Sequence, residues 1–222
     1  MTNNLRRCAR PLALALLVGG LAMPAWSQTA QDWEIGPVIR GKNYSVGMPL
    51  HPAQGRGQSW SFDFPRAPDA RGRGGHVHYV TFAPGSLAGK TKIRVRYRID
   101  AAQGVRFVPQ EFPDRTAVMS LYFQRRGDTW TAKGRYRFYR WYAPNAAVQT
   151  IEPGVHEFTL ALDDPRWIAV MGGTSSTNPA KFRQALEQVS RVGLVFGSNG
   201  GRGHGVYATG PARFTLLSFH IS

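Results

Sequence analysis

Apolar and polar side chains alternate most regularly between residues 91 and 100, in the stretch TKIRVRYRID. Successive side chains of a β-strand point to opposite faces, so this spacing predicts a strand with one apolar face and one basic face. The apolar face consists of Ile93, Val95, Tyr97 and Ile99. The basic face consists of Arg94, Arg96 and Arg98.

Shorter stretches of the same kind, separated by Gly, Pro and Asp, predict further strands. We expect them at 59–64, 76–82, 117–126, 156–162, 192–197 and 212–221. One stretch, 179–190, has helical spacing instead, with Asn178 as N-cap and Pro179 at the first helical position. The pattern predicts an all-β protein, an antiparallel two-sheet jelly-roll sandwich with one short helix near 179–190.

The chain divides into a leader and one domain. Arginines precede an apolar run of residues 11–22, and the small residues Ala25 and Ser27 follow it, which is typical of a signal peptide over residues 1–27. Residues 28–58 then form an N-terminal extension or the first strands, and 59–222 a single β-sandwich domain. No second long apolar run follows, so we expect a periplasmic or secreted protein without a transmembrane segment after cleavage. Its one cysteine, Cys8, lies in the leader.

The most unusual stretch is GRYRFYRWYA, residues 134–143. It follows Gly127-Asp128, which favours a hairpin whose second arm is a long strand. Even positions, from Tyr136 to Tyr142, are the more apolar, so we place them inward. The outward set is then Arg135, Arg137, Tyr139 and Trp141. On the first arm, Tyr122 faces outward together with Ser120 and Gln124.

The charge of the chain indicates an anionic partner. Without the three arginines of the leader, 25 basic side chains stand against 13 acidic ones, a net charge of +12. Only five of the basic residues are lysines, and guanidinium groups suit bidentate contact with carboxylate, sulfate or phosphate. Export makes nucleic acid a poor candidate. We therefore expect a polysaccharide or another anionic surface glycan, and no cofactor.

The C-terminal part carries a resemblance. FTLALDDPRWIAVMGG, then FRQALEQVSRVGLVFG, then GRGHGVYATGPARFTLLSFHI, spans roughly the last 65 residues. The order of a strand, a tryptophan near a glycine pair, a short helix, a Val-Gly-Leu strand and a GHG loop resembles galactose-binding-like, carbohydrate-binding β-sandwich domains of exported bacterial proteins. The resemblance implies a jelly roll that binds rather than catalyses. It carries over no individual ligand-binding residue.

Two groups of residues are candidates for the ligand site. The first is a basic, aromatic platform, with Arg96 and Arg98 in the same sheet as Tyr122, Arg137, Tyr139 and Trp141. Rings stack on sugars and arginines hold acidic groups; alternatively, the arginine stems only cover an outer sheet face. The second is the loop GSNGGRGHGVY, residues 197–207, with Arg202 and His204. This loop is alternatively a tight connection between strands.

Other functions remain open. His76 and His78 share one strand face, which is a metal-ligand spacing, but no third ligand follows and we expect no metal. A uronate polysaccharide lyase would need a proton carrier and cations, which Tyr139, Arg137 and His204 would supply. A structural envelope or matrix protein would instead bury Tyr139 and Trp141. Our leading hypothesis is an exported, non-enzymatic, lectin-like module for an anionic glycan.

Overall fold

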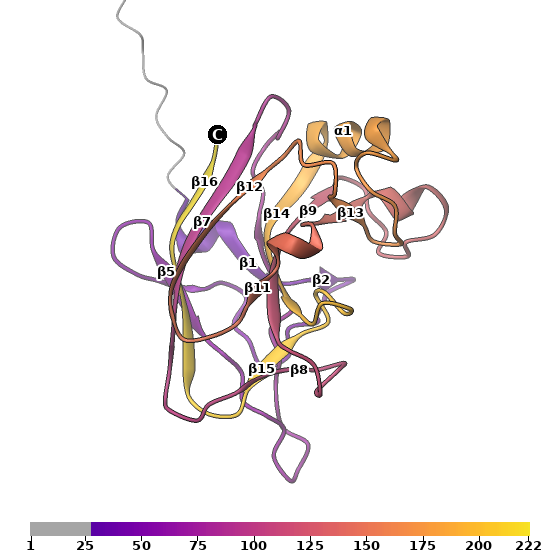
Figure 1. Ribbon diagram of the computed structural model, residues 1–222. Coiled ribbons are helices and arrows are strands. Elements are labelled where there is room, and N and C mark those ends of the chain that lie inside the picture. The colour runs from indigo at the N-terminus through magenta and orange to yellow at the C-terminus, as the bar shows by residue number, and fades with distance from the viewer. Residues whose placement is uncertain (1–27) are drawn as a thin grey trace, which may run out of the picture.

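A computed structural model describes residues 28–222, and the predicted signal peptide lies outside the described residues. The described part is mostly β-strand, with one α-helix, so the prediction of an all-β protein with a short helix is confirmed. Two large antiparallel sheets, one of seven strands and one of five, form a sandwich (Figure 1). No helix in this part of the chain is long and apolar enough to cross a membrane.

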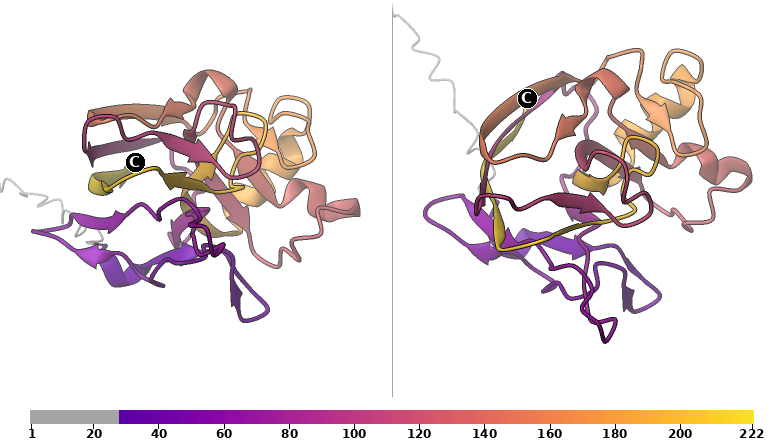
Figure 2. Two further views of the ribbon diagram at one scale, coloured as in Figure 1. Left: turned by 90° about the horizontal axis from the view of Figure 1, so that it is seen from below. Right: turned by 60° about the horizontal axis from the view of Figure 1, so that its bottom comes forward.

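The seven-stranded sheet has the order β1-β6-β14-β9-β10-β13, and β11 also pairs with β9. Its strands are β1 (Trp33–Gly36), β6 (Tyr79–Phe82), β14 (Val189–Gly197), β9 (Val118–Arg125), β10 (Arg140–Tyr142), β13 (Ile168–Ala169) and β11 (Gln149–Thr150). The expected strands at 117–126 and 192–197 therefore lie side by side near its centre. The N-terminal strands, in indigo and purple, lie along one side of the molecule (Figure 2).

The five-stranded sheet has the order β12-β7-β16-β5-β4. Its strands are β12 (Gly154–Ala161), β7 (Lys92–Ala101), β16 (Ala212–Ile221), β5 (Trp60–Asp63) and β4 (Ala53–Gln54). Two small hairpins complete the strands, β2 (Val38–Ile39) with β3 (Lys42–Asn43) and β8 (Phe107–Pro109) with β15 (Val206–Ala208). The alternation predicted for β7 is confirmed, because its apolar side chains are buried and its arginines exposed.

The core lies between the two sheets and is rich in aromatic rings. Phe196 of β14 packs against Phe62 of β5 with ring centres 5.8 Å apart, and against Phe214 of β16 at 5.9 Å. Each fully buried phenylalanine contributes roughly 1.5–3 kcal/mol relative to an exposed one. These contacts join opposite sheets, so they fix how the sheets face each other.

The α-helix, α1 (Pro179–Glu187), begins at the predicted proline and covers one end of the core with Phe182 and Ala185. Asn178 stands at the N-cap position but does not cap the helix, because its side chain donates to Thr177 Oγ1 instead. The helix is shorter than the 179–190 predicted. Val189, which fits the helical spacing, begins β14 and is buried in the sandwich.

Candidate functional site

The stretch 134–142 is not the long strand that its composition predicts. Residues Gly134–Phe138 form a 3-10 helix, η2, and only Arg140–Tyr142 pair with β9. The backbone has positive φ angles at Trp130 (64°), Ala132 (54°) and Gly134 (54°). A strand cannot continue through such left-handed residues, so the hairpin arm is interrupted before β10.

The assignment of faces in this stretch is also wrong. Trp141 is opposite Phe123 in the register and is fully buried in the sandwich core, 4.9 Å from the ring of Phe182. Tyr142 is opposite Tyr122 and lies on the outer face of the sheet. Along a strand, a shift of one residue exchanges the two faces, and the interruption before β10 has this effect.

The remaining members of the platform are distributed over different surfaces. Tyr139 is buried against Arg125, whose guanidinium carbon lies 4.5 Å from the ring centre, and Arg137 is exposed on η2. Burial of Tyr139 and Trp141 is what a structural envelope or matrix protein predicts, and it counts against this stretch as a ligand site. Arg96 and Arg98 belong to the five-stranded sheet and not to the sheet of Tyr122, so the continuous platform does not exist.

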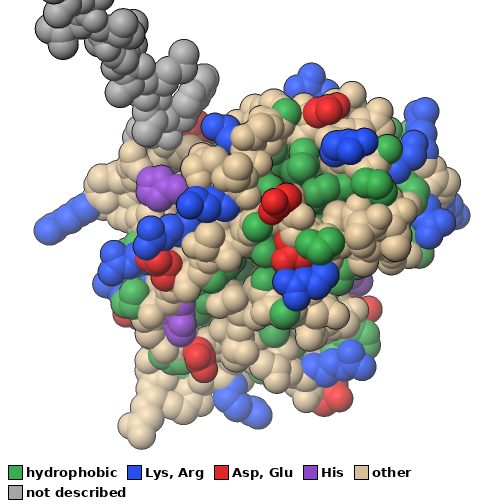
Figure 3. All heavy atoms as spheres, turned by 45° about the horizontal axis from the view of Figure 1, so that its top comes forward, with side chains coloured by type: hydrophobic (Ala, Val, Ile, Leu, Met, Phe, Trp, Pro, Cys, Tyr) green, Lys and Arg blue, Asp and Glu red, His purple; other side chains and the backbone are tan. Residues whose placement is uncertain are grey.

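We call the outer face of β7, with Arg94, Arg96 and Arg98, the arginine face. Its charges are largely balanced by neighbours: Arg94 lies 2.6 Å from Glu157, and Arg98 lies 2.9 Å from Asp100. Figure 3 shows one face of the molecule on which acidic side chains lie among the basic ones. This arrangement is that of a solvated sheet face whose arginine stems cover the strands.

The outer face of the seven-stranded sheet carries instead a tyrosine cluster, Tyr79, Tyr122 and Tyr142. The hydroxyls of Tyr79 and Tyr142 share a hydrogen bond of 3.0 Å. Burial raises the pKa of all three phenols above the ordinary value, so they are neutral hydroxyl donors and acceptors. The prediction that Tyr122 faces away from the core is confirmed, since Met119, Leu121 and Phe123 occupy the core side of β9.

A buried ion pair anchors this cluster at one side. The Asp128 carboxylate, 1% exposed, lies 3.0 Å from Arg140 Nε. It also accepts hydrogen bonds from Gln124 Nε2 at 2.9 Å and from the backbone amide of Trp130 at 3.1 Å. Asp128 therefore ties the loop after β9 to the sheet and holds Trp130 beside the cluster, 5.6 Å from the ring of Tyr79.

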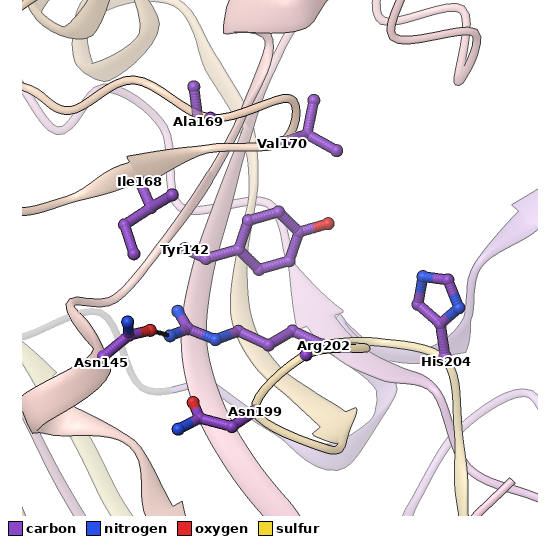
Figure 4. Close-up of a pocket in the computed structure, with 10 residues that line it drawn as sticks. Tyr142, Asn145, Ile168, Ala169, Val170, Asn199, Arg202 and His204 are labelled. Carbon is purple, nitrogen blue, oxygen red and sulfur yellow. Dashed lines mark hydrogen bonds between the residues drawn. The ribbon is translucent and has the colours of Figure 1, made fainter. Parts of the chain in front are cut away.

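A hollow of about 270 Å³, the first hollow, opens beside Tyr142 (Figure 4). Polar side chains from two loops line it, together with apolar residues at β13. The polar residues are Asn145, Asn199, Arg202 and His204, and the apolar ones include Ile168, Ala169 and Val170. Of the eight residues predicted from sequence as ligand contacts, Arg202 and His204 are the two that this hollow brings together.

Arg202 is the unusual member of the first hollow. Its guanidinium donates to the backbone oxygen of Ala143 and to Asn145 Oδ1. Within residues 28–222 it forms no ion pair with an acidic side chain, although it is half-buried. Burial lowers its pKa, because desolvation disfavours the charged form. A guanidinium has five donors, so several remain for a ligand.

The glycine-rich loop between β14 and β15 brings Arg202 and His204 to this position. At Gly203, φ is +75°, and a Cβ atom would lie 2.5 Å from the hydroxyl of Tyr79. The loop therefore lies directly against the tyrosine cluster, and glycine permits this close approach. His78 Nδ1 donates to the carbonyl oxygen of Gly203 at 2.6 Å and fixes the loop from the other side.

His204 has a carboxylate partner. Its Nδ1 lies 2.5 Å from Glu111 Oε2, and both side chains are about half exposed. This contact leaves Nε2 as the ring nitrogen available to a ligand. The other two histidines of interest, His76 and His78, have ring centres 4.6 Å apart. In the described part of the chain, no three His, Cys, Asp or Glu side chains are grouped so that they would hold a metal ion.

No protein-family model matches the chain, and no curated protein matches it in sequence. Sequence analysis did not single out Tyr79, Tyr142 or Trp130 as site residues. The available signal was Asp128, the acid after Gly127, because such a residue can accept hydrogen bonds from its own loop and hold an irregular connection.

Proposed function

We propose that this protein is an exported module that binds an acidic glycan in the first hollow. The anionic ligand expected from the arginine content would lie beside Arg202. The resemblance to galactose-binding-like sandwiches and the signal peptide expected at residues 1–27 support a role outside the cytoplasm. The two-sheet fold is compatible with that resemblance, and fold alone does not assign a ligand.

One observation carries the proposal: the half-buried guanidinium of Arg202 has no acidic partner among residues 28–222. A partly desolvated cation is costly unless an anion pairs with it. A sugar carboxylate in the hollow would complete this pairing and accept two parallel hydrogen bonds. The amides of Asn145 and Asn199 supply further donors and acceptors on the same wall.

The arginine face is the natural comparison. Arg94 and Arg98 already contact acidic side chains, and the first hollow does not include this face. Ion pairs between exposed side chains contribute little, so a ligand there would have to compete with Glu157 and Asp100 for weak contacts. The two surfaces therefore give opposite expectations for the same kind of substitution.

The test compares Arg202→Gln with Arg96→Gln by titration calorimetry with tetragalacturonate. Arg202→Gln keeps an amide donor for the carbonyl of Ala143 and removes the charge. We expect it to weaken binding at least about tenfold, since a hydrogen bond to a charged group contributes about 1.5–3 kcal/mol. Arg96→Gln should change affinity less than about twofold.

Asn199→Ala serves as a second variant, because Asn199 lines the hollow and its side chain is not needed to hold Arg202. It should also weaken binding, with the thermal unfolding temperature unchanged. Equal effects of Arg202→Gln and Arg96→Gln would show that binding is not located in the first hollow. Absence of binding to tetragalacturonate and to sulfated oligosaccharides at low salt would contradict the proposal itself.

A second candidate function is β-elimination of a uronate chain at the same hollow. The observation that favours it is the contact between Glu111 and His204, in a hollow that also has Tyr142 and Arg202 on its walls. His204 Nε2 would take the proton from the carbon next to the carboxylate, whose charge Arg202 neutralises. The bond to the leaving oxygen breaks as the double bond forms, and the Tyr142 hydroxyl donates a proton to that oxygen.

Ultraviolet absorbance of the unsaturated product tests this second candidate. Turnover of polygalacturonate that disappears in His204→Ala and in Tyr142→Phe would establish a lyase. Arg96→Gln is the control that should keep the full rate. A flat trace on polygalacturonate, alginate and hyaluronan, with binding intact, would leave the protein a binding module.

A further inference from the structure

A second hollow, of about 410 Å³, lies on the other side of the tyrosine cluster. Tyr79 and Tyr122 line it, whereas Tyr142 lines the first hollow. Because the hydroxyls of Tyr79 and Tyr142 are 3.0 Å apart, the two hollows meet at this tyrosine pair. The second hollow also has the ring of Trp130 and the amide of Gln124 on its walls.

The hydroxyl of Tyr122 is the first sign of a ligand there. Tyr122 is 1% exposed, and its Oη has no hydrogen-bond partner among the described residues. A buried hydroxyl without a partner is costly, and native proteins satisfy most such groups. The oxygen is closed to solvent in this conformation, so a hydroxyl group of a bound sugar would supply the missing partner once a neighbouring side chain moves aside.

The conformation of Trp130 is the second sign. A positive φ angle is an outlier for a bulky side chain, and here it is 64°. Two hydrogen bonds hold Trp130 in this conformation. Asp128 accepts one from the Trp130 amide, and Arg140 donates the other to the Trp130 carbonyl oxygen at 3.2 Å. Such strain is concentrated at ligand sites. The indole thereby stands at the wall of the second hollow. The Arg140 guanidinium covers one of its faces at 4.9 Å, so a sugar ring would stack on the other face.

The charges of the second hollow indicate what kind of sugar fits. Two acidic residues line it, and both already have a basic partner: Asp128 contacts Arg140, and Glu34 contacts Arg191 at 2.9 Å. The carboxylate of an acidic sugar would lie near these two carboxylates, and both arginines are already paired with them. A neutral polyhydroxyl ring would use the aromatic and hydroxyl groups and leave these ion pairs intact.

We propose that the second hollow binds a neutral sugar unit directly linked to the acidic unit in the first hollow. The ligand would then be a heteropolysaccharide in which acidic and neutral sugars are neighbours, and not a homopolymer of uronates. This inference rests on the proposed function, because it takes the acidic unit at Arg202 as given. It adds the identity of the neighbouring unit.

The experiment compares two tetrasaccharides by titration calorimetry at one salt concentration. In the hyaluronan tetrasaccharide, glucuronate alternates with a neutral N-acetylhexosamine. Tetragalacturonate instead carries a carboxylate on every unit. The alternating probe should bind at least about tenfold more tightly. Tyr122→Phe should weaken this probe about five- to tenfold, since it removes one hydrogen bond, and should leave tetragalacturonate unchanged.

Trp130→Ala should weaken the same probe without affecting tetragalacturonate. Ala132→Gly is the matched control: it relaxes the other non-glycine residue with positive φ in this loop, outside the hollow, and should not change affinity. Equal binding of both probes, with no effect of Tyr122→Phe, would overturn this inference and leave the proposed function standing. Failure of both probes to bind would overturn the two together.

Discussion

His78 is a half-buried histidine whose surroundings favour the neutral form. Its Nδ1 donates to Gly203, and this hydrogen bond holds the loop that carries Arg202 and His204. Burial lowers the pKa of His78 to about 4, because the charged ring would lose its water. In the sequence, His76 and His78 have the spacing of a pair of metal ligands. In the structure, His78 holds the loop through Gly203.

The shifted pKa of His78 predicts a loss of stability in acid. The unfolded chain protonates this ring near the ordinary pKa of 6.5, and the folded chain only near 4. Stability that is present above pH 6.5 is therefore lost as the pH falls from about 6.5 to 4, by about 3 kcal/mol at most. Urea unfolding between pH 7 and 4 measures it.

His78→Asn keeps a donor for the Gly203 carbonyl and should flatten this pH dependence. His220→Asn, at the exposed end of β16, is the control that should retain it. Burial also lowers the pKa of His76, so this residue adds a smaller loss of stability in acid. An acid transition that is identical in His78→Asn and in the unchanged protein would contradict this assignment.

At the scale of elements, regular alternation of apolar and polar residues predicted the strands correctly, whereas composition alone did not. β7 and β16 lie where the period of two predicts them, because a strand with one buried face leaves the sequence little freedom. The stretch 134–142 has more aromatic rings than either of these strands. Its path nevertheless depends on positive φ angles and on Asp128, which contacts Gln124 before the loop and Arg140 after it. No local pattern encodes such contacts, so the exposed face, and with it most of the predicted site, was misplaced.

The loop between β9 and β10 should depend strongly on Asp128. Asp128→Ala leaves the Arg140 guanidinium buried without its counterion and removes the acceptor for Gln124 and for the Trp130 amide. We expect a loss of about 3–5 kcal/mol in the free energy of unfolding, as is typical when one partner of a buried ion pair is removed. Chemical denaturation gives this value directly.

Asp69→Ala is the matched control for that substitution, since Asp69 forms an ion pair with Arg73 on the exposed surface. Its effect on stability should be small. If both substitutions cost the same, Asp128 does not organise the loop. The second hollow would then lack the support that holds Trp130 in place.

The two outer faces of the sandwich differ as wholes. Two of the three arginines of the arginine face are paired with acidic side chains. The face of the seven-stranded sheet instead has two hollows that meet at a tyrosine pair. The strong basic charge was visible in the sequence and favoured the first of these faces. The second could not be predicted, because it assembles residues from β6, β9, β10 and the loop after β14, and no sequence spacing relates them. The jelly-roll connectivity stays a prediction.

The response to salt distinguishes these faces in the intact protein. Binding of polygalacturonate in the first hollow uses one guanidinium, so raising the salt from about 50 to 200 mM should reduce affinity only about fourfold. Adsorption over many exposed arginines would release a counterion at each contact, so the same rise in salt would reduce the affinity about a thousandfold or more. Over the same range, the net charge of +12 that remains without the three leader arginines predicts a higher free energy of unfolding, since salt screens self-repulsion. A steep loss of affinity that Arg202→Gln leaves unchanged would assign binding to the basic surface as a whole.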